Sequence, residues 1–279
     1  MTRPSSAAAR VSPRARPPSE AHADEGVRLL WTSGWDSTFQ LLRVVLLHRL
    51  PVTPYYLEDA TRASTATELD AIARITATLH AQYPHTRALL HPLRRFRVAD
   101  LEPDTGIVEA LREVRTRMYI GSQYAWLPMF CKQHGVDGIE MSVHVDDKVQ
   151  ALLSSRVVAF QQADAYRSVR VAPGQAGTPE HTLFRYFSFP LFSIDKRAME
   201  REAGLAGWGP LMEMTWFCHR PLRGRPCGLC APCVYTIEEG LARRVPRTRR
   251  VLSFVYRLLA RPLKPPLRKA WTSLRRSRA

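Results

Sequence analysis

The sequence predicts an α/β protein in which a parallel β-sheet is covered by helices on both faces. The continuous apolar run VRLLW at 27–31 is typical of a central strand that is buried on both sides. Further short apolar runs alternate with segments whose apolar residues recur at helical spacing. With 279 residues and 45% hydrophobic content, the chain has enough apolar material for one sizeable core with appendages.

The first half of the chain is predicted to form three strands and two helices in alternation. Apolar residues recur at helical spacing from Phe39 to Leu46, so we expect the first helix to begin at Ser37 and to end before Pro51. The elements expected next are a strand at 52–58, a helix at 65–83 and a third strand at 87–93.

The second half continues this alternation as far as a fourth strand. Residues 107–134 are expected to be helical in two pieces, and the strand expected at 138–143 precedes the polar loop HVDDK. Several Gly and Pro residues predict a loop at 172–190, and 189–205 is typical of a strand end followed by a helix.

The positive charge is concentrated at the C-terminal end. The formal net charge is +16; residues 241–279 hold 13 of the 41 Lys and Arg and no Asp or Glu, whereas the other 28 basic residues are nearly balanced by 25 acidic ones. No apolar run reaches the roughly 18 residues of a membrane span. Residues 1–25 contain no apolar run that would serve as a signal peptide. We therefore expect a soluble cytoplasmic protein.

The segment TSGWDST joins the first predicted strand to the first predicted helix. At such a junction small residues let backbone N–H groups converge on an anion. Gly34 would allow close approach, and Ser37 could cap the helix and offer a hydroxyl group to phosphate or metal. Ordinary helix capping is the alternative reading. The candidate phosphate-binding residues are Thr32, Ser33, Gly34, Trp35, Asp36, Ser37 and Thr38.

Four of the five cysteines are crowded into CHRPLRGRPCGLCAPC. C-x2-C turns supply two zinc ligands from one bend of the backbone, and Pro and Gly between them make a rigid knuckle. The pattern predicts structural zinc, with an iron–sulfur cluster, redox chemistry or free thiols as alternatives. His219 is expected to be a bystander and Cys131 a core residue. The predicted ligands are Cys218, Cys227, Cys230 and Cys233.

The loop resembles the SGGxDS pyrophosphate loop of the adenine nucleotide alpha hydrolase (PP-loop ATPase) superfamily, with Thr32 in place of Ser and Ser33 in place of the first Gly. Together with the cysteines it resembles the 7-cyano-7-deazaguanine synthase family, in which TW-x-C precedes PCG-x-C-x-x-C. Here TWFC at 215–218 precedes PCGLCAPC at 226–233. The resemblance implies a Rossmann-like sheet of the HUP type, ATP and Mg²⁺ as cofactors, and a homodimer.

The resemblance also implies a reaction. A carboxylate would be adenylated by ATP, and ammonia or another amine would then displace AMP. Asp36, Ser37 and Lys196 are the implied catalytic residues, and Glu68 is a further candidate contact. The implied substrate-binding residues are Arg117, Asp146 and Asp147. Lys196 and the two aspartates have an alternative reading as solvated side chains.

Some segments depart from the family. LEDATR at 57–62 stands where the family has a YGQ-type sequence, so a different carboxylate substrate is expected. ATP-dependent modification of tRNA or of a protein terminus and a non-catalytic zinc-stabilised nucleotide-binding module remain alternatives. The implied domains are a disordered leader at 1–25, the nucleotide-binding domain at 26–210, a zinc knuckle at 211–240 and a basic tail at 241–279.

The basic tail carries apolar residues at helical spacing, namely Leu252, Val255, Leu258 and Leu259. Prolines at 262, 265 and 266 then interrupt the pattern, so we expect one short amphipathic helix, a kinked stretch and a second basic piece around Trp271. The expected partner is an anionic membrane surface, which would place the protein at the inner face of the membrane, or RNA. A solvated extension is the alternative.

Overall fold

The computed structural model describes residues 26–260, which contain a seven-stranded sheet of order β3-β2-β1-β4-β7-β6-β5. The five strands from β3 to β7 in this order are parallel, whereas β6 and β5 are antiparallel additions at one edge. The strands are β1 Val27–Leu30, β2 Val52–Glu58, β3 Arg94–Arg97, β4 Ile139–Glu140, β5 Val157–Gln162, β6 Tyr166–Val171 and β7 Phe187–Ser188.

Helices connect the parallel strands and continue beyond the sheet. The helices are α1 Trp35–Leu42, α2 Thr65–Gln82, α3 Thr86–Leu89, α4 Thr105–Arg117, α5 Gln123–His134, α6 Lys148–Leu153, α7 Pro179–Phe184, α8 Lys196–Leu205, α9 Gly209–Glu213, α10 Ala231–Glu238 and α11 Arg247–Val255. Short 3₁₀ turns occur at Val98–Asp100, Pro173–Gln175 and Ala242–Arg244, and π-helical turns follow α1 at Arg43–Leu47 and α11 at Tyr256–Ala260.

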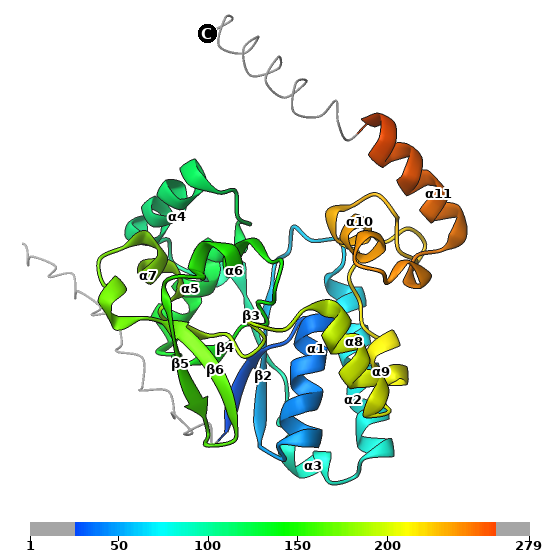
Figure 1. Ribbon diagram of the computed structural model, residues 1–279, viewed down its shortest axis with the longest axis horizontal. Coiled ribbons are helices and arrows are strands. Elements are labelled where there is room, and N and C mark those ends of the chain that lie inside the picture. The colour runs from blue at the N-terminus through cyan, green and yellow to red at the C-terminus, as the bar shows by residue number, and fades with distance from the viewer. Residues whose placement is uncertain (1–25, 261–279) are drawn as a thin grey trace, which may run out of the picture.

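Apolar cores form on both faces of the sheet. One core joins α1, α2, α8 and α9 to the sheet through residues such as Phe39, Ile75 and Met199. The other joins α4, α5, α6 and α7 through residues such as Val114 and Phe130. The ribbon shows the two groups of helices on opposite sides of the sheet (Figure 1). The predicted fold class, with helices on both faces and a C-terminal four-cysteine cluster, is therefore confirmed.

The third strand is not where the sequence pattern placed it. Residues Thr86–Leu89 form the short helix α3, and β3 begins at Arg94, after the predicted strand at 87–93 has ended. Leu90 makes only an isolated bridge to Val52. Because β3 is an edge strand with a single neighbour, it tolerates three arginines in four positions, and its sequence lacks the apolar signature of a buried strand.

The region predicted as a loop at 172–190 contains helix α7 and strand β7. Thr178 caps α7 by accepting a hydrogen bond from the His181 N–H group at 3.2 Å, and Pro179 occupies the first turn. This Thr-Pro pair is a recognisable helix start that the Gly and Pro content of the segment obscured. The preceding β5–β6 hairpin was likewise not predicted.

The order of the strands creates a crevice at one edge of the sheet. From β1 the chain passes outward through β2 to β3, and it then returns to form β4 on the other side of β1. Ligands of open α/β sheets bind beyond the carboxyl ends of the strands at such a reversal. The loop after β1, which contains the predicted phosphate-binding residues, and the loop after β4, which contains His144 to Asp147, both border this point.

Candidate nucleotide-binding site and cysteine centre

The loop after β1 turns directly into helix α1, with Gly34 as the N-cap residue. The Thr38 N–H group donates the first helical hydrogen bond to the Gly34 carbonyl at 3.0 Å. The N–H groups of Trp35, Asp36 and Ser37 lie in the first turn, where an α-helix offers no backbone acceptor. A Cβ atom on Gly34 would lie 3.4 Å from Thr32 Oγ1 and 3.8 Å from Ser37 Oγ, which is ordinary contact distance. Free N–H groups at the start of a helix are the feature by which helix N-termini bind anions.

Ser33 adopts a conformation that normally favours glycine. Its φ is +57°, and its side chain is fully buried. A non-glycine residue in this region costs on the order of 1 kcal/mol, and the loop is held by a 2.8 Å hydrogen bond from the Trp216 N–H group to the Ser33 carbonyl. The loop therefore retains a glycine-like backbone despite the serine, and the segment before the cysteines supports it.

Two adjoining cavities open in front of this loop. The first, of about 530 Å³, extends from Gly34 and Asp36 to Lys196 and to the C-terminal segment at Glu239 and Arg244. The second, of about 460 Å³, lies over the ends of the central strands and is lined by Leu30, Tyr55, Leu57, Met141 and Val143. Gly34, Asp36 and Asp147 line both cavities. Volumes of this size are usual for small-molecule sites.

A cluster of ionisable side chains faces the first cavity. The Asp36 Oδ2 atom lies 3.7 Å from both Lys196 Nζ and His144 Nε2, and Lys196 Nζ lies 2.7 Å from Glu239 Oε2. Burial lowers the pKa of Lys196, but Asp36 and Glu239 outweigh it and leave the pKa raised. Burial raises the pKa of Asp147, with a further contribution from Asp36. Lys196 is therefore held as a cation beside the candidate phosphate-binding turn.

Asp36 has one oxygen atom that the rest of the described chain does not satisfy. Within residues 26–260, its Oδ1 atom is buried and accepts no hydrogen bond. A buried carboxylate oxygen usually has a partner, so an unpaired one at the mouth of a cavity suits a ligand or a metal ion. This position fits the Mg²⁺ that the family resemblance implies.

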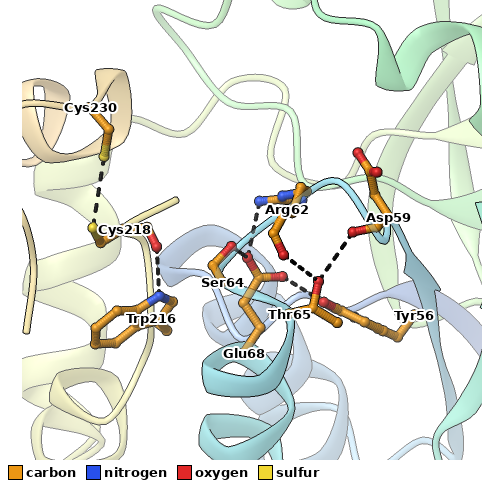
Figure 2. Close-up of polar contacts among 9 residues, drawn as sticks. All are labelled: Tyr56, Asp59, Arg62, Ser64, Thr65, Glu68, Trp216, Cys218 and Cys230. Atoms are coloured by element: carbon orange, nitrogen blue, oxygen red, sulfur yellow. Dashed lines mark hydrogen bonds and ion pairs between the residues drawn. The ribbon is translucent and has the colours of Figure 1, made fainter. Parts of the chain in front are cut away.

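Glu68 lines the first cavity, and Figure 2 shows its polar contacts. Its buried carboxylate accepts hydrogen bonds from Tyr56 at 2.8 Å, from Ser64 at 2.7 Å and from Arg62 at 3.0 Å. These contacts compensate the buried charge and hold the Arg62 guanidinium group, which lines both cavities. The predicted role of Glu68 as a neighbouring contact fits this placement.

Arg244 lines the first cavity from the C-terminal segment. Its guanidinium carbon lies 5.1 Å from the centre of the Trp35 ring and 4.9 Å from that of Phe217, and its side chain is only 4% exposed. It donates hydrogen bonds to the carbonyl oxygen and hydroxyl group of Thr215. Burial lowers its pKa to about 10, so it remains charged at neutral pH. Stacking between two rings fixes this cation next to the phosphate loop.

The four predicted cysteine ligands converge on one point. All four Sγ atoms lie within 4.8 Å of one another, and the pairs Cys227–Cys233 and Cys218–Cys230 are 3.9 Å apart. The N–H groups of Leu229 and Cys230 point at the Cys227 sulfur, at 3.4 Å and 3.3 Å. This donor set could hold a metal ion. Cys131 is buried within the apolar core, where burial raises its pKa.

The cysteine centre is connected directly to the phosphate loop. Trp216 Nε1 donates to the Cys218 carbonyl at 2.8 Å (Figure 2), while the Trp216 main chain holds Ser33. Helix α10 contains Cys233 and leads into Glu239, the partner of Lys196. The cysteine cluster is thus connected to two sides of the cavity, at Ser33 and at Glu239.

The structure brings together most of the predicted site residues. The residues that line a cavity are Thr32, Gly34, Trp35, Asp36, Ser37, Asp146, Asp147 and Lys196. Ser33 and Thr38 line neither cavity. The Thr38 Oγ1 atom accepts a hydrogen bond from Trp31 Nε1 at 3.0 Å. Arg117 does not join the site, because it lines neither cavity and pairs with the buried Glu180 at 2.8 Å.

Several residues of the site were not anticipated from the sequence. His144 follows β4 as Asp36 follows β1, so its position at the strand end was a usable signal. Glu239 and Arg244 could not be recognised from the local sequence. Glu239 follows a helix without a distinctive motif, and Arg244 is one of many arginines in a basic segment.

No protein-family model matches the sequence, and no curated protein matches it. Among solved structures, the chain is similar to the U34-tRNA thiolase NcsA from Methanococcus maripaludis, which was determined with its [4Fe-4S] cluster. The TM-score is 0.40 at 10% sequence identity, and the match covers 85% of this chain and 72% of that chain. A likeness at this level assigns no activity.

Proposed function

We propose that this chain is an ATP-dependent enzyme that activates a carboxylate by adenylation. The observation that carries the proposal is the glycine-containing turn at 32–38, placed at the strand reversal with the ionisable side chains of Asp36, Lys196 and His144 in front of it. An anion-binding turn and a fixed cation are what a polyphosphate needs, and the carboxyl end of the sheet is where α/β proteins bind nucleotides. The similarity of the two sequence motifs to 7-cyano-7-deazaguanine synthases supports the same reaction class.

The second cavity suits the nucleoside. Its walls carry Leu30, Leu57, Met141 and Val143, with Tyr55 beside them, and it meets the phosphate-binding turn at Gly34 and Ser37. Apolar surfaces of this kind cover the faces of a base. The triphosphate would then run along the first turn of α1 toward Lys196, and the carboxylate substrate would occupy the first cavity.

The proposed reaction has two steps. A carboxylate oxygen attacks the α-phosphorus atom of ATP, the bond from this phosphorus to the bridging oxygen breaks, and pyrophosphate leaves. The nitrogen of ammonia or another amine then attacks the acyl carbon, loses a proton to a base, and expels AMP. The protein contributes positioning and electrostatic stabilisation through the N–H groups of Trp35 to Ser37 and the charge of Lys196. Mg²⁺, held by Asp36, would neutralise phosphate charge.

The cysteine centre is proposed to bind structural zinc. In a tetrahedral site with zinc–sulfur distances of about 2.3 Å, sulfurs lie about 3.8 Å apart, and the two close pairs here are 3.9 Å apart. A four-iron cluster holds each cysteine on a different iron atom and so needs a wider spacing. Four thiolates also leave no open position for a reacting group. The metal would therefore stabilise the knuckle that supports Ser33 and supplies Glu239.

The acceptor is proposed to differ from the deazaguanine carboxylate. The segment at 57–62, which departs from the family, contributes Asp59 and Arg62 to the second cavity, and Arg62 extends into the first. A guanidinium group at this position favours an anionic substrate, because Arg binds carboxylates and phosphates through paired N–H groups. A second candidate acceptor is tRNA, which the net charge of +16 favours.

The test is to incubate the protein with Mg-ATP, ammonium and a panel of carboxylates, including the deazaguanine carboxylate, and to measure AMP and pyrophosphate. Carboxylate-dependent release of both products is expected, and the Asp36→Ala variant should abolish it without unfolding the protein. A parallel incubation with tRNA in place of the carboxylates tests the second acceptor. Tight ATP binding without product release under every condition would reject the enzyme proposal in favour of a nucleotide-binding module.

A further inference from the structure

Helix α11 and the π-helical turn after it direct an apolar face away from the protein. Six side chains on this face are between 40% and 65% exposed, namely Val251, Leu252, Phe254, Val255, Leu258 and Leu259. We refer to them as the α11 apolar face. The ribbon places α11 at the periphery of the molecule, beyond the cysteine knuckle (Figure 1).

The opposite, polar side of α11 holds the helix to the protein. Ser253 is fully buried, and Arg257 pairs with Glu238 of α10 at 3.7 Å. The Arg249 carbonyl approaches Gly228 of the knuckle so closely that an added Cβ would lie 2.6 Å from it. An amphipathic helix at a protein surface normally buries its apolar stripe and exposes its polar side. Here the arrangement is reversed, so the helix is fixed in an orientation that presents apolar side chains.

Such a face requires a partner. Single exposed apolar residues are ordinary, whereas a contiguous group on one helix face marks an interaction site. In the part of the chain that the structure describes, no helix is long and apolar enough to cross a membrane. A helix of this kind can instead lie in the plane of a lipid surface with its apolar face inserted.

The charge of the segment selects among partners. Residues 241–279 carry 13 Lys and Arg and no acidic residue. A second copy of this chain would bring the same positive charge to the contact and be repelled. RNA would attract the charge but leave the apolar face exposed to water, because nucleic-acid binding rests on phosphate neutralisation. A bilayer with anionic headgroups satisfies the charge and covers the apolar side chains together.

We propose that the α11 apolar face docks this protein onto an anionic lipid bilayer. The side chains of Val251, Phe254 and Leu258 insert between headgroups, and the net positive charge of 241–279 attracts the segment to the lipid phosphates, although Arg244 and Arg257 are held by the protein itself. The docking is independent of the proposed ATP chemistry, because none of the inserting residues lines either cavity. The sequence predicts an amphipathic helix in this segment, and the fold shows that its apolar side faces outward.

The experiment is flotation of the full chain with phosphatidylcholine vesicles that contain phosphatidylglycerol, compared with pure phosphatidylcholine vesicles. The variants are Val251→Glu, Phe254→Glu and Leu258→Glu, singly and combined. Each single variant is expected to lower the partition coefficient onto the vesicles about tenfold, as loss of one inserted apolar side chain implies. The matched control is Leu205→Glu on α8, where the leucine is 92% exposed and outside the proposed surface, and it should bind vesicles like wild type.

Each of several results would overturn the proposal. These are wild-type flotation of the combined variant, equal binding of the wild type to the two kinds of vesicle, and an RNA mobility shift without any vesicle binding. Light scattering would also overturn it if the wild type were a dimer that the combined variant splits into monomers, since a second copy would then cover the face. Unchanged circular dichroism and metal content of each variant would show that the substitutions act at the surface.

Discussion

Lys196 is the single residue on which the proposed chemistry depends most. It lies between Asp36 and Glu239, so it joins the phosphate-binding turn to the end of α10. We expect Lys196→Met to lower kcat/KM for the carboxylate by roughly 100-fold or more, as measured by AMP formation at saturating Mg-ATP. This is the usual cost of removing one transition-state contact. Lys196→Arg should retain part of the activity because it keeps the charge.

The matched control is Lys132→Met, which removes an exposed lysine that pairs with Asp104 on the other face of the sheet. Wild-type kinetics of Lys196→Met at saturating Mg-ATP would remove this residue from the mechanism.

Glu140 is a buried carboxyl group at the centre of the sheet, away from both cavities. It accepts hydrogen bonds from Tyr166 and Gln40, yet burial raises its pKa to about 7. Because the pKa in the folded protein exceeds the model-peptide value, the protonated group stabilises the fold below about pH 4.5, and this contribution is lost as the pH rises through 7.

We therefore expect the free energy of unfolding to fall by roughly 3 kcal/mol between about pH 4.5 and 7 through this group alone. Urea titrations across this range, for wild type and Glu140→Gln, isolate the effect. The glutamine variant should lose this part of the pH dependence, and an unchanged profile would contradict the assignment.

At the scale of single residues, the sequence could predict those that carry a local signal. Asp36 and Ser37 stand in a strand–turn–helix motif, and Lys196 stands at a helix start after a recognisable segment, so pattern and family resemblance located them. Arg244 could not be located in this way, because its role arises from two rings, Trp35 and Phe217, that only the folded chain brings to it. Arg117 was predicted as a substrate contact but lies outside the site. It pairs with the buried Glu180 on α7, a helix that was not predicted.

At the scale of elements, central strands and long helices could be predicted because burial imposes their patterns. Strands β1 and β2 and helix α2 lie where the apolar periodicity placed them. The β5–β6 hairpin escaped prediction because its turn uses Ala163 and Asp164 at positive φ, without the glycine that usually marks such a turn. Of the predicted tail, the first short helix corresponds to α11, whereas the piece around Trp271 lies outside the described residues.

The cysteine knuckle is an element whose stability we propose to depend on a bound zinc ion. We expect one zinc ion per chain, and Cys227→Ser should lower both the zinc content and the yield of folded protein, because metal binding free energy is folding free energy at such sites. Cys131→Ser serves as the control, since Cys131 is buried in the core and away from the cluster. Elemental analysis of the purified proteins decides the question, and wild type with iron or no metal would contradict the assignment.

The contact between α11 and the knuckle can be tested by two glycines with similar backbone conformations. Gly228 and Gly224 have φ of +79° and +72°, so alanine is strained at both. Only at Gly228 would the new methyl group meet a neighbour, the Arg249 carbonyl at 2.6 Å. Gly228→Ala should therefore detach α11 and make the segment after Arg247 sensitive to limited proteolysis. Gly224→Ala should lower the free energy of unfolding only through the strain of alanine at positive φ, which both variants share. Equal protease resistance of the two variants would mean that α11 is held in another way.

At the scale of the whole molecule, the candidate nucleotide site is assembled from both ends of the described chain. Trp35 comes from the first helix, Phe217 precedes the cysteine cluster, and Arg244 lies beyond it. We expect Arg244→Ala to raise the KM for ATP and to shift Trp35 emission to longer wavelength, because the ring loses its cover. Arg225→Ala, on the surface of the knuckle, is the control. An unchanged KM for ATP would show that the stacked cation is dispensable.

This dependence on Arg244 has a consequence for the nascent protein. The ribosome makes the turn at 32–38 early. Trp216, which holds Ser33 in its glycine-like conformation, and Arg244, which covers Trp35, are added only after about two hundred more residues have been synthesised. At 5–20 residues per second this delay is roughly 10–40 s. Throughout that interval the turn lacks the Trp216 hydrogen bond and the Arg244 cation. On the proposed function, we therefore expect nucleotide to bind only to a chain whose synthesis has passed the cysteine cluster.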